Sequence, residues 1–377
     1  MTCTSGTPWV QGSNSTTHPT DLLLPAGTIV IPSTWIIPSQ TSVIGEGTGR
    51  TIIQAASPST TLGDMIDFGS SALCGTQCSS IGLSGVTLDG QGQAVNGVVN
   101  NNAGELSYVR DTTIKCVEGA GSTGAGLYIG SGANNSGPYR DLWIFAGGTG
   151  VCSQGNANTN TACVRIAGAS TRGVHGITCT ANGTPYAGIY LDGSNNTIED
   201  AHFEGVVDGI AVGDSGPAAS NVVLNITGGG GGSTSGPIDN IVHICSSTST
   251  ATPCSTSSGP VTDLSLLSIA GNQAQYHAVY MVVDNVTGTS IPAPAWPGQG
   301  FVGLYALGEP IGSGYSRFVT NTVASSTSVT PTWGVGTTVP GSTCTDQNGS
   351  LFSNTSGTNG GLNTLFVCLG ATWANIK

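Results

Sequence analysis

Short segments in which apolar and polar residues alternate recur along residues 85–285 and fall into two series. The first series ends on Ile114, Ile144, Ile177, Phe203 and Ile226. The second comprises Leu127-Tyr-Ile129, Val164-Arg-Ile166, Ile189-Tyr-Leu191, Ile210-Ala-Val212 and Val242-His-Ile244. Members of the two series alternate, and 26 residues separate Ile177 from Phe203. Because a repeat of this length with short strands is typical of a solenoid, and a period of two buries one face of each strand, we predict a parallel β-helix. Its second series should bury one column of side chains: Leu127, Val164, Ile189, Ile210 and Val242.

The segment before these repeats has a pattern of its own. It runs Leu22-Leu-Leu-Pro-Ala-Gly-Thr-Ile-Val-Ile31, then Trp35-Ile-Ile-Pro-Ser39, then Ser42-Val-Ile-Gly-Glu-Gly-Thr-Gly-Arg-Thr-Ile-Ile53. This text resembles the first coil of the pectate-lyase-like superfamily, and the resemblance covers about residues 22–290. It implies an all-β, right-handed parallel β-helix. It implies no single activity, because the same scaffold serves lyases, glycosidases, phage tailspikes and non-enzymatic surface proteins.

The domain organisation that follows has three parts. We expect an N-terminal arm at residues 1–20, the β-helix at residues 21–320 and a small disulfide-tied β-hairpin module at residues 321–377. The module resembles the terminal modules of bacterial surface and fibre proteins. Superfamily members usually place an amphipathic helix before the first coil, whereas residues 1–20 show no helical apolar period. We therefore expect an open first coil, which either the N-terminal arm covers or another copy of the chain stacks on, end to end.

Composition narrows the partners and the compartment. Only 7% of the 377 residues are charged, and 8 basic against 20 acidic residues give a net charge of −12. Without a basic cluster the main source of nucleic-acid affinity is missing, and no apolar run is long enough for a membrane span. The 11 cysteines indicate an oxidising compartment. We expect a secreted, extracellular or cell-surface protein, and since the chain opens Met1-Thr-Cys3 without a signal peptide, we infer that a leader was removed or is not part of this sequence.

Most cysteines lie close enough in sequence to form local disulfides. The candidate pairs are Cys74 with Cys78, Cys152 with Cys163, Cys245 with Cys254, and Cys344 with Cys368. A metal site is the alternative for Cys74 and Cys78, but no second cysteine pair or histidine pair accompanies them. We therefore predict no metal and no other cofactor. The pairing of Cys3, Cys116 and Cys179 stays open.

The second series directs a column of side chains outward: Tyr128, Arg165, Tyr190, Ala211 and His243. Arg165 between two tyrosines suits cation–π stacking. One interpretation is a stabilising surface ladder. The other is an aromatic and guanidinium strip that binds sugar rings or a neighbouring subunit.

Aligning the first series on its terminal apolar residues gives another outward face. It carries Thr113 and Lys115, Trp143 and Phe145, Gly176 and Thr178, His202 and Glu204, and Asn225 and Thr227. Trp143 beside Phe145 forms a stacking platform for carbohydrate. His202 with Glu204 is the nearest approach to a catalytic acid/base pair. Glycoside hydrolysis uses two carboxyl groups roughly 5 to 9.5 Å apart, and the acidic residues of this chain are dispersed over strand ends and turns.

Two hypotheses about function remain. The first is a secreted structural or adhesive β-helix that assembles with other copies into an extracellular fibre, favoured by the missing cap helix and the low charge. The alternative is a polysaccharide lyase, a glycoside hydrolase or a carbohydrate-binding protein that works along the face from Trp143 to Glu204. Polysaccharide is the expected ligand in the second case.

Overall fold

A computed structural model of the chain describes residues 20–56, 62–75, 77–117, 124–146, 162–168, 170–181, 187–214, 216, 218–229, 240–244, 261–262, 265–270, 277–281, 333–336, 351–354, 364–369 and 372–376. The chain divides into two compact units. The first comprises residues 1–287 and 299–311, and the second comprises residues 288–298 and 312–377. The expected boundary between residues 320 and 321 lies outside the described residues, as does nearly all of the expected N-terminal arm.

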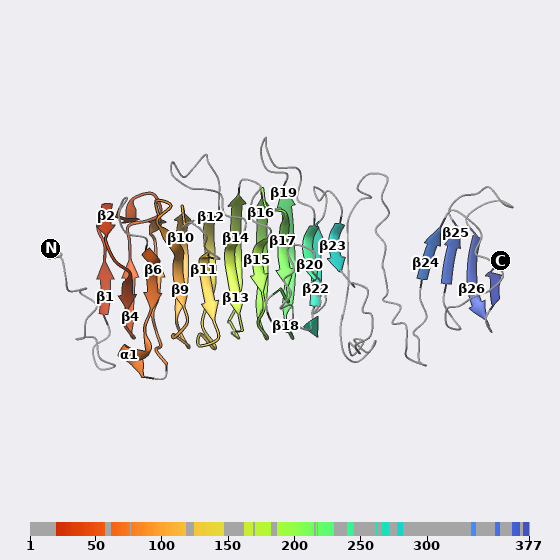
Figure 1. The fold of residues 1–377 in the computed structure, drawn as a ribbon, viewed down its shortest axis with the longest axis horizontal. Coiled ribbons are helices and arrows are strands. Elements are labelled where there is room, and N and C mark those ends of the chain that lie inside the picture. The colour runs from red at the N-terminus through yellow and green to blue at the C-terminus, as the bar shows by residue number, and fades with distance from the viewer. Residues whose placement is uncertain are drawn as a thin grey trace. The chain divides into compact units, whose positions relative to one another are not determined.

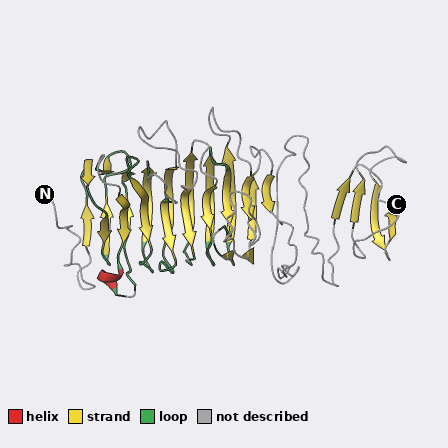
Figure 2. Cartoon of the chain, in the orientation of Figure 1, coloured by secondary structure: helices red, strands yellow, loops and turns green. Residues whose placement is uncertain are grey.

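The first unit is a parallel β-helix in which successive turns of the chain add strands to two long parallel sheets (Figures 1 and 2). The first sheet has 12 described strands in the order β1 (Thr20–Leu23), β4 (Thr41–Ile44), β7 (Gly82–Ser84), β10 (Tyr108–Lys115), β12 (Tyr139–Ala146), β14 (Val174–Ala181), β16 (Thr197–Glu204), β19 (Val222–Gly229) and β22 (Ser265–Ala270), with β2 (Gly27–Ile31), β5 (Thr51–Ala55) and β8 (Thr87–Asp89) leading to β10. The second sheet has 9 described strands in the order β3 (Trp35–Ile37), β6 (Leu62–Phe68), β9 (Ala94–Asn100), β11 (Ala125–Gly130), β13 (Ala162–Ala167), β15 (Ala187–Leu191), β17 (Asp208–Val212), β20 (Asn240–Ile244) and β23 (His277–Met281). A further pair joins β18 (Ala218–Ala219) to β21 (Val261–Thr262), and the short helix α1 is Ser71–Cys74.

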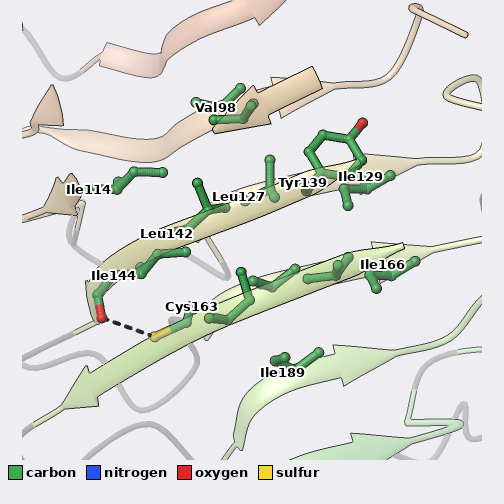
Figure 3. Close-up of a cluster of buried hydrophobic side chains, with 14 of the residues drawn as sticks. Val98, Ile114, Leu127, Ile129, Tyr139, Leu142, Ile144, Cys163, Ile166 and Ile189 are labelled. Carbon is green, nitrogen blue, oxygen red and sulfur yellow. Dashed lines mark hydrogen bonds between the residues drawn. The ribbon is translucent and has the colours of Figure 1, made fainter. Parts of the chain in front are cut away.

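The predicted inner column of the second sheet is confirmed. Its five members pair in register on neighbouring strands and all are fully buried: Leu127, Val164, Ile189, Ile210 and Val242. Figure 3 shows Val98, Leu127 and Ile189 of the same column within the buried cluster. The fold class is therefore a parallel β-helix, and the resemblance to the pectate-lyase-like superfamily holds at the level of the fold.

In the core, a glycine of the second sheet faces a large side chain of the first sheet. A Cβ atom added at Gly126 would lie 2.4 Å from a methyl carbon of Ile144. One coil further, Cys163 takes the place of Gly126 and Cys179 takes the place of Ile144. A disulfide joins these two cysteines. The sulfur of Cys163 also lies 3.4 Å from the backbone oxygen of Ile144 (Figure 3). The disulfide thus crosses the core from the second sheet to the first.

The cysteine predictions meet mixed outcomes. The disulfide between Cys74 and Cys78 is confirmed. The predicted pairing of Cys152 with Cys163 is wrong, because Cys163 points into the core, where it meets Cys179 from β14. Cys116 also forms a disulfide. The remaining predictions concern cysteines that lie outside the described residues or whose side chains are not described: Cys3, Cys152, Cys245, Cys254, Cys344 and Cys368.

A row of residues with left-handed backbone conformation crosses the first sheet, one on each coil. Its members are Gly85 (φ 67°), Asp111 (φ 48°), Asp141 (φ 56°), Gly176 (φ 62°), Asp200 (φ 56°) and Asn225 (φ 53°). Only Gly, Asn and Asp adopt this conformation readily. This left-handed row bends each strand and separates two outward surfaces of the first sheet.

The second unit contains a four-stranded sheet formed by β24 (Trp333–Gly336), β25 (Leu351–Asn354), β26 (Thr364–Leu369) and β27 (Thr372–Ile376). The predicted hairpin is present as the antiparallel pair β25–β26. A third antiparallel strand follows, because the chain reverses after Leu369 and Trp373 lies on β27, opposite Cys368. No helix in the described part of the chain is long and apolar enough to cross a membrane.

Candidate functional site

Two adjacent rows of side chains face outward from the first sheet on one side of the left-handed row. Backbone register places Thr113, Trp143, Thr178 and His202 in one row and Lys115, Phe145, Thr180 and Glu204 in the other. We refer to the part on β12, β14 and β16 as the Trp143 strip: Trp143, Phe145, Thr178, Thr180, His202 and Glu204. It contains both members of the predicted stacking platform and both members of the predicted acid/base pair.

Two coils of the predicted outward face are wrongly aligned. Ile177 pairs with Leu142 rather than with Ile144, and Ile226 pairs with Ala201. The predicted alignment is therefore off by two residues. A shift of two residues keeps every side chain on the same face of its strand, so the alternation of inward and outward residues does not reveal it. As a consequence Gly176 and Asn225 belong to the left-handed row instead of the strip.

Trp143 is the most distinctive side chain of the strip. It is 51% exposed, whereas most large apolar side chains of the β-helix are buried. Its ring stacks on Phe145 with the centroids 5.1 Å apart and the planes at 29°. Its Nε1 donates a 3.5 Å hydrogen bond to Oγ1 of Thr180. These two contacts orient the indole, and about half of its surface stays open to a ligand.

A cleft of about 360 Å³ lies beside Trp143. Its other lining residues come from two neighbouring strands and from two glycine-containing turns: Asp111, Thr112, Thr113, Asp141, Gly47, Thr48 and Gly85. The size falls within the range of small-molecule pockets, roughly 300 to 1,000 Å³.

The Gly-Glu-Gly-Thr-Gly segment at residues 45–49 forms one wall of this cleft. Backbone hydrogen bonds of 2.9 Å run from the nitrogen of Gly45 to the oxygen of Ser84 and from the nitrogen of Gly47 to the oxygen of Gly85. A Cβ atom at Gly45 would lie 2.3 Å from the oxygen of Gly85, so this close approach requires glycine. The segment that carries the superfamily resemblance therefore also shapes the cleft.

The cleft presents two carboxylates, those of Asp111 and Asp141. Each side chain is 61% exposed. Nε of Arg110 lies 3.9 Å from Oδ2 of Asp111, and Nε of Arg140 lies 3.8 Å from Oδ2 of Asp141. Both distances exceed hydrogen-bonding range. Each aspartate therefore forms a loose, exposed ion pair with the arginine that precedes it.

His202 and Glu204 lie at the far end of the strip. Nε2 of His202 is 3.1 Å from Oε1 of Glu204, and its Nδ1 is 2.8 Å from Oγ1 of Thr227. Both ring nitrogens thus have partners. The residues in register with Glu204 on the adjacent strands are Thr180 and Gly229. The neighbouring positions therefore do not supply the second carboxyl group that glycoside hydrolysis uses, and a catalytic role for this pair stays a prediction.

The outward column of the second sheet has the expected register but not the expected accessibility. Tyr128, Arg165 and Tyr190 lie on adjacent strands, and the guanidinium of Arg165 lies 4.1 Å above the Tyr190 ring. Tyr190 and His243 are each only 3% exposed, and Ala211 is fully buried. Facing away from the core therefore does not make this column a continuous binding surface.

Three members of that column and the neighbouring Asp208 of β17 form a polar group that we call the Tyr190 cluster: the half-buried Arg165 and the buried Tyr190, Asp208 and His243. Nδ1 of His243 lies 2.6 Å from Oδ2 of Asp208, and the two side chains are 4% and 2% exposed. Burial raises the pKa of Tyr190, Asp214 and Asp208 raise it further, and Arg165 lowers it. The alternating sequence pattern does not reveal this pair, because Asp208 and His243 lie on different coils. Among the described residues no group of three or more His, Cys, Asp or Glu side chains is arranged to hold a metal ion.

Comparison with known proteins gives similarity at the level of the fold. No family model matches the chain, and no curated protein matches it. Solved structures that are similar include ORF18 of Geobacillus virus E2, with 15% identity and a TM-score of 0.32 over 72% of this chain and 56% of that chain. The A-module of the Azotobacter vinelandii mannuronan C-5 epimerase AlgE4 has 12% identity and a TM-score of 0.28 over 71% of this chain and 90% of that chain. The Streptococcus pneumoniae surface protein and adhesin PfbA has 9% identity and a TM-score of 0.34 over 69% of this chain and 83% of that chain.

Proposed function

We propose that the protein is a secreted structural or adhesive β-helix that binds polysaccharide along the Trp143 strip. The observation that carries this proposal is the exposed indole of Trp143, fixed against Phe145 at the edge of a cleft. Aromatic side chains contribute large contact areas to binding sites. The strip also lies on regular strands, which hold binding residues more rigidly than loops do.

The spacing of the strip suits a polymer. Adjacent strands lie roughly 4.8 Å apart, which is comparable to the length of one sugar residue. Thr178 and Thr180 lie one strand beyond Trp143, and His202 and Glu204 lie two strands beyond it. Successive sugar rings therefore meet an aromatic face first and then hydrogen-bonding groups. The disulfides at Cys74–Cys78 and Cys163–Cys179 fit a secreted protein, because such bonds persist in oxidising compartments.

Affinity electrophoresis through gels that contain plant, microbial or animal polysaccharides tests the proposal. We expect at least one polysaccharide to retard the wild type and Trp143→Ala to lose this retardation while it melts at the same temperature. Leu106→Ala is the control, because Leu106 is 58% exposed and lies outside the strip. Equal retardation of Trp143→Ala and wild type contradicts the proposal. Release of new chain ends that Glu204→Gln abolishes supports the enzymatic alternative instead.

Assembly of copies end to end is a second candidate function, favoured by the first coil. Within the described residues β1, β2 and β3 pair on one side only. Leu23 on β1 is 72% exposed and Val30 on β2 is 56% exposed. Unpaired strand edges with apolar side chains are templates for further strands, and the occupant we propose is another copy of this chain.

Sedimentation velocity and electron microscopy test this assembly. We expect concentration-dependent growth of the wild type, and its loss when Leu23→Lys and Val30→Lys are combined, since charges on an edge strand oppose pairing. Leu106→Lys controls for added charge elsewhere. A wild type that remains a monomer at high concentration overturns this candidate without affecting the polysaccharide proposal.

A further inference from the structure

The described residues that line the cleft beside Trp143 include two carboxylates, each of which forms a loose ion pair with the arginine that precedes it. Among these described lining residues Asp111 and Asp141 are acidic, and none is Lys, Arg or His. A ligand in the cleft therefore meets an aromatic face, threonine hydroxyl groups and two carboxylates. Together these groups restrict the chemical class of the ligand more than the aromatic platform does alone.

The two carboxylates occupy equivalent places on neighbouring strands. Arg110 pairs with Arg140 and Thr112 with Leu142, so Asp111 and Asp141 lie side by side in the left-handed row. Their backbones are separated by one strand spacing, roughly 4.8 Å. Both side chains are therefore directed from the same bend of the first sheet toward the same cleft.

Neither carboxylate is occupied by a close donor in the described part of the chain. The nearest cation to Asp111 is Arg110, at 3.9 Å, and the guanidinium of Arg110 lies over the Tyr108 ring, 5.0 Å from its centroid. Asp200, in the same row but outside the cleft, accepts a hydrogen bond from Nδ2 of Asn225. Gly176 has no side chain to extend the pair. Asp111 and Asp141 thus differ from Asp200 in that only the loose contacts with Arg110 and Arg140 have to yield to a ligand that donates hydrogen bonds.

We propose that the cleft binds a basic amino sugar, of the glucosamine type, within a polysaccharide. This inference rests on the proposed function and names its ligand class. A sugar ammonium group donates charge-assisted hydrogen bonds to Asp111 and Asp141, and the face of Trp143 attracts the same cation. A uronate would instead place its carboxylate against two like charges, which is unfavourable.

Calorimetric titration with three tetrasaccharides tests the ligand class: a glucosamine tetrasaccharide, its N-acetylated counterpart and a galacturonate tetrasaccharide. We expect wild type to bind the glucosamine tetrasaccharide about tenfold or more tightly than the N-acetylated one, since each charge-assisted hydrogen bond is worth roughly this factor. The double variant Asp111→Asn/Asp141→Asn should lose this preference. Asn tolerates a left-handed backbone, so its melting temperature should not change.

Asp200→Asn is the matched control, because it removes one carboxylate from the same row outside the cleft. It should keep the preference. Equal loss in Asp200→Asn indicates general attraction of a cation to a chain with a net charge of −12 and overturns the inference.

The remaining outcomes separate this inference from the proposed function. If a neutral or acidic glycan binds as tightly as the glucosamine tetrasaccharide and Trp143→Ala abolishes that binding, the ligand class is wrong and the proposed function stands. If no glycan binds, or if Trp143→Ala binds as wild type does, the proposed function itself is wrong.

Discussion

The two sheets of the β-helix carry the same chemical pair in opposite surroundings. On the first sheet Nε2 of His202 lies 3.1 Å from Glu204, with the side chains 40% and 46% exposed. On the second sheet Nδ1 of His243 lies 2.6 Å from Asp208, with the side chains 4% and 2% exposed. Both pairs point away from the core in a regular parallel register. Strand alternation therefore sets the direction of a side chain, whereas its exposure depends on what covers the sheet.

This difference separates binding from stability. Exposed ion pairs contribute little because water screens them, so the Trp143 strip can present polar and aromatic groups without becoming part of the folded core. A buried pair is costly to disrupt, because removal of one partner leaves an uncompensated polar group. The Tyr190 cluster should therefore stabilise the β-helix, and the Trp143 strip should bind a ligand.

The largest expected effect is that of breaking the buried pair. We expect His243→Ala to lower the free energy of unfolding by roughly 3 to 5 kcal/mol, because the buried Asp208 loses the imidazole that lies 2.6 Å from its carboxylate. The matched variant His202→Ala should change it by less than about 1 kcal/mol. Denaturant unfolding measures both, and similar losses in the two variants would contradict the comparison.

The disulfide that joins the two sheets through the core should have the next largest effect. Cys163 and Cys179 are 16 residues apart, and replacement of both by Ala should cost about 3 kcal/mol by the chain-entropy model. The control removes Cys74–Cys78, which closes a separation of only 4 residues and should cost less. Chemical denaturation under non-reducing conditions compares the unfolding free energies of the variants. A larger loss from removal of Cys74–Cys78 would contradict the role of the core disulfide.

A smaller effect concerns the pH dependence of stability. Burial, together with the neighbouring Asp64, raises the pKa of Asp67 on β6 to about 7. In the unfolded chain this pKa is about 3.9, so the folded state binds the proton more tightly. The stability from this group is complete below the unfolded pKa and is lost as the pH rises toward 7.

Asp67→Asn provides the test of this pH dependence, since its amide has no proton to lose. Thermal unfolding between acidic and neutral pH should show a steeper decline for wild type than for the variant. Asp111→Asn, an exposed aspartate on the first sheet, is the control and should leave the wild-type slope intact. Parallel curves for wild type and Asp67→Asn would refute the role of this carboxyl group.

Much of the fold is predictable from the sequence because the repeat has a strict apolar period. The inner column from Leu127 to Val242, the outward direction of Trp143 and the disulfide between Cys74 and Cys78 all follow from local patterns. The exposure of the side chains on the second sheet does not follow from these patterns, since alternation carries no information about the segments that cover a sheet. Tyr190 was therefore expected on an accessible surface, and the structure buries it.

Long-range pairing is the other part that local patterns do not determine. A two-residue shift keeps every side chain on its face, so the alignment placed Gly176 in the strip although it belongs to the left-handed row. Cys163 was assigned to the nearest cysteine in sequence, whereas coil stacking brings it to Cys179. The signal that would have corrected the register is the recurrence of Gly, Asp or Asn at the same place on successive coils: Gly85, Asp111, Asp141, Gly176, Asp200 and Asn225.

Hydroxyl-radical footprinting with and without bound polysaccharide tests most directly whether the first sheet, rather than the second, is the binding face. Trp143 and Phe145 on the first sheet and Tyr128 on the second are aromatic and at least partly exposed, so all three should be oxidised in the free protein. The account predicts that polysaccharide protects Trp143 and Phe145 and leaves the oxidation of Tyr128 unchanged. Protection of Tyr128 with continued oxidation of Trp143 would contradict it.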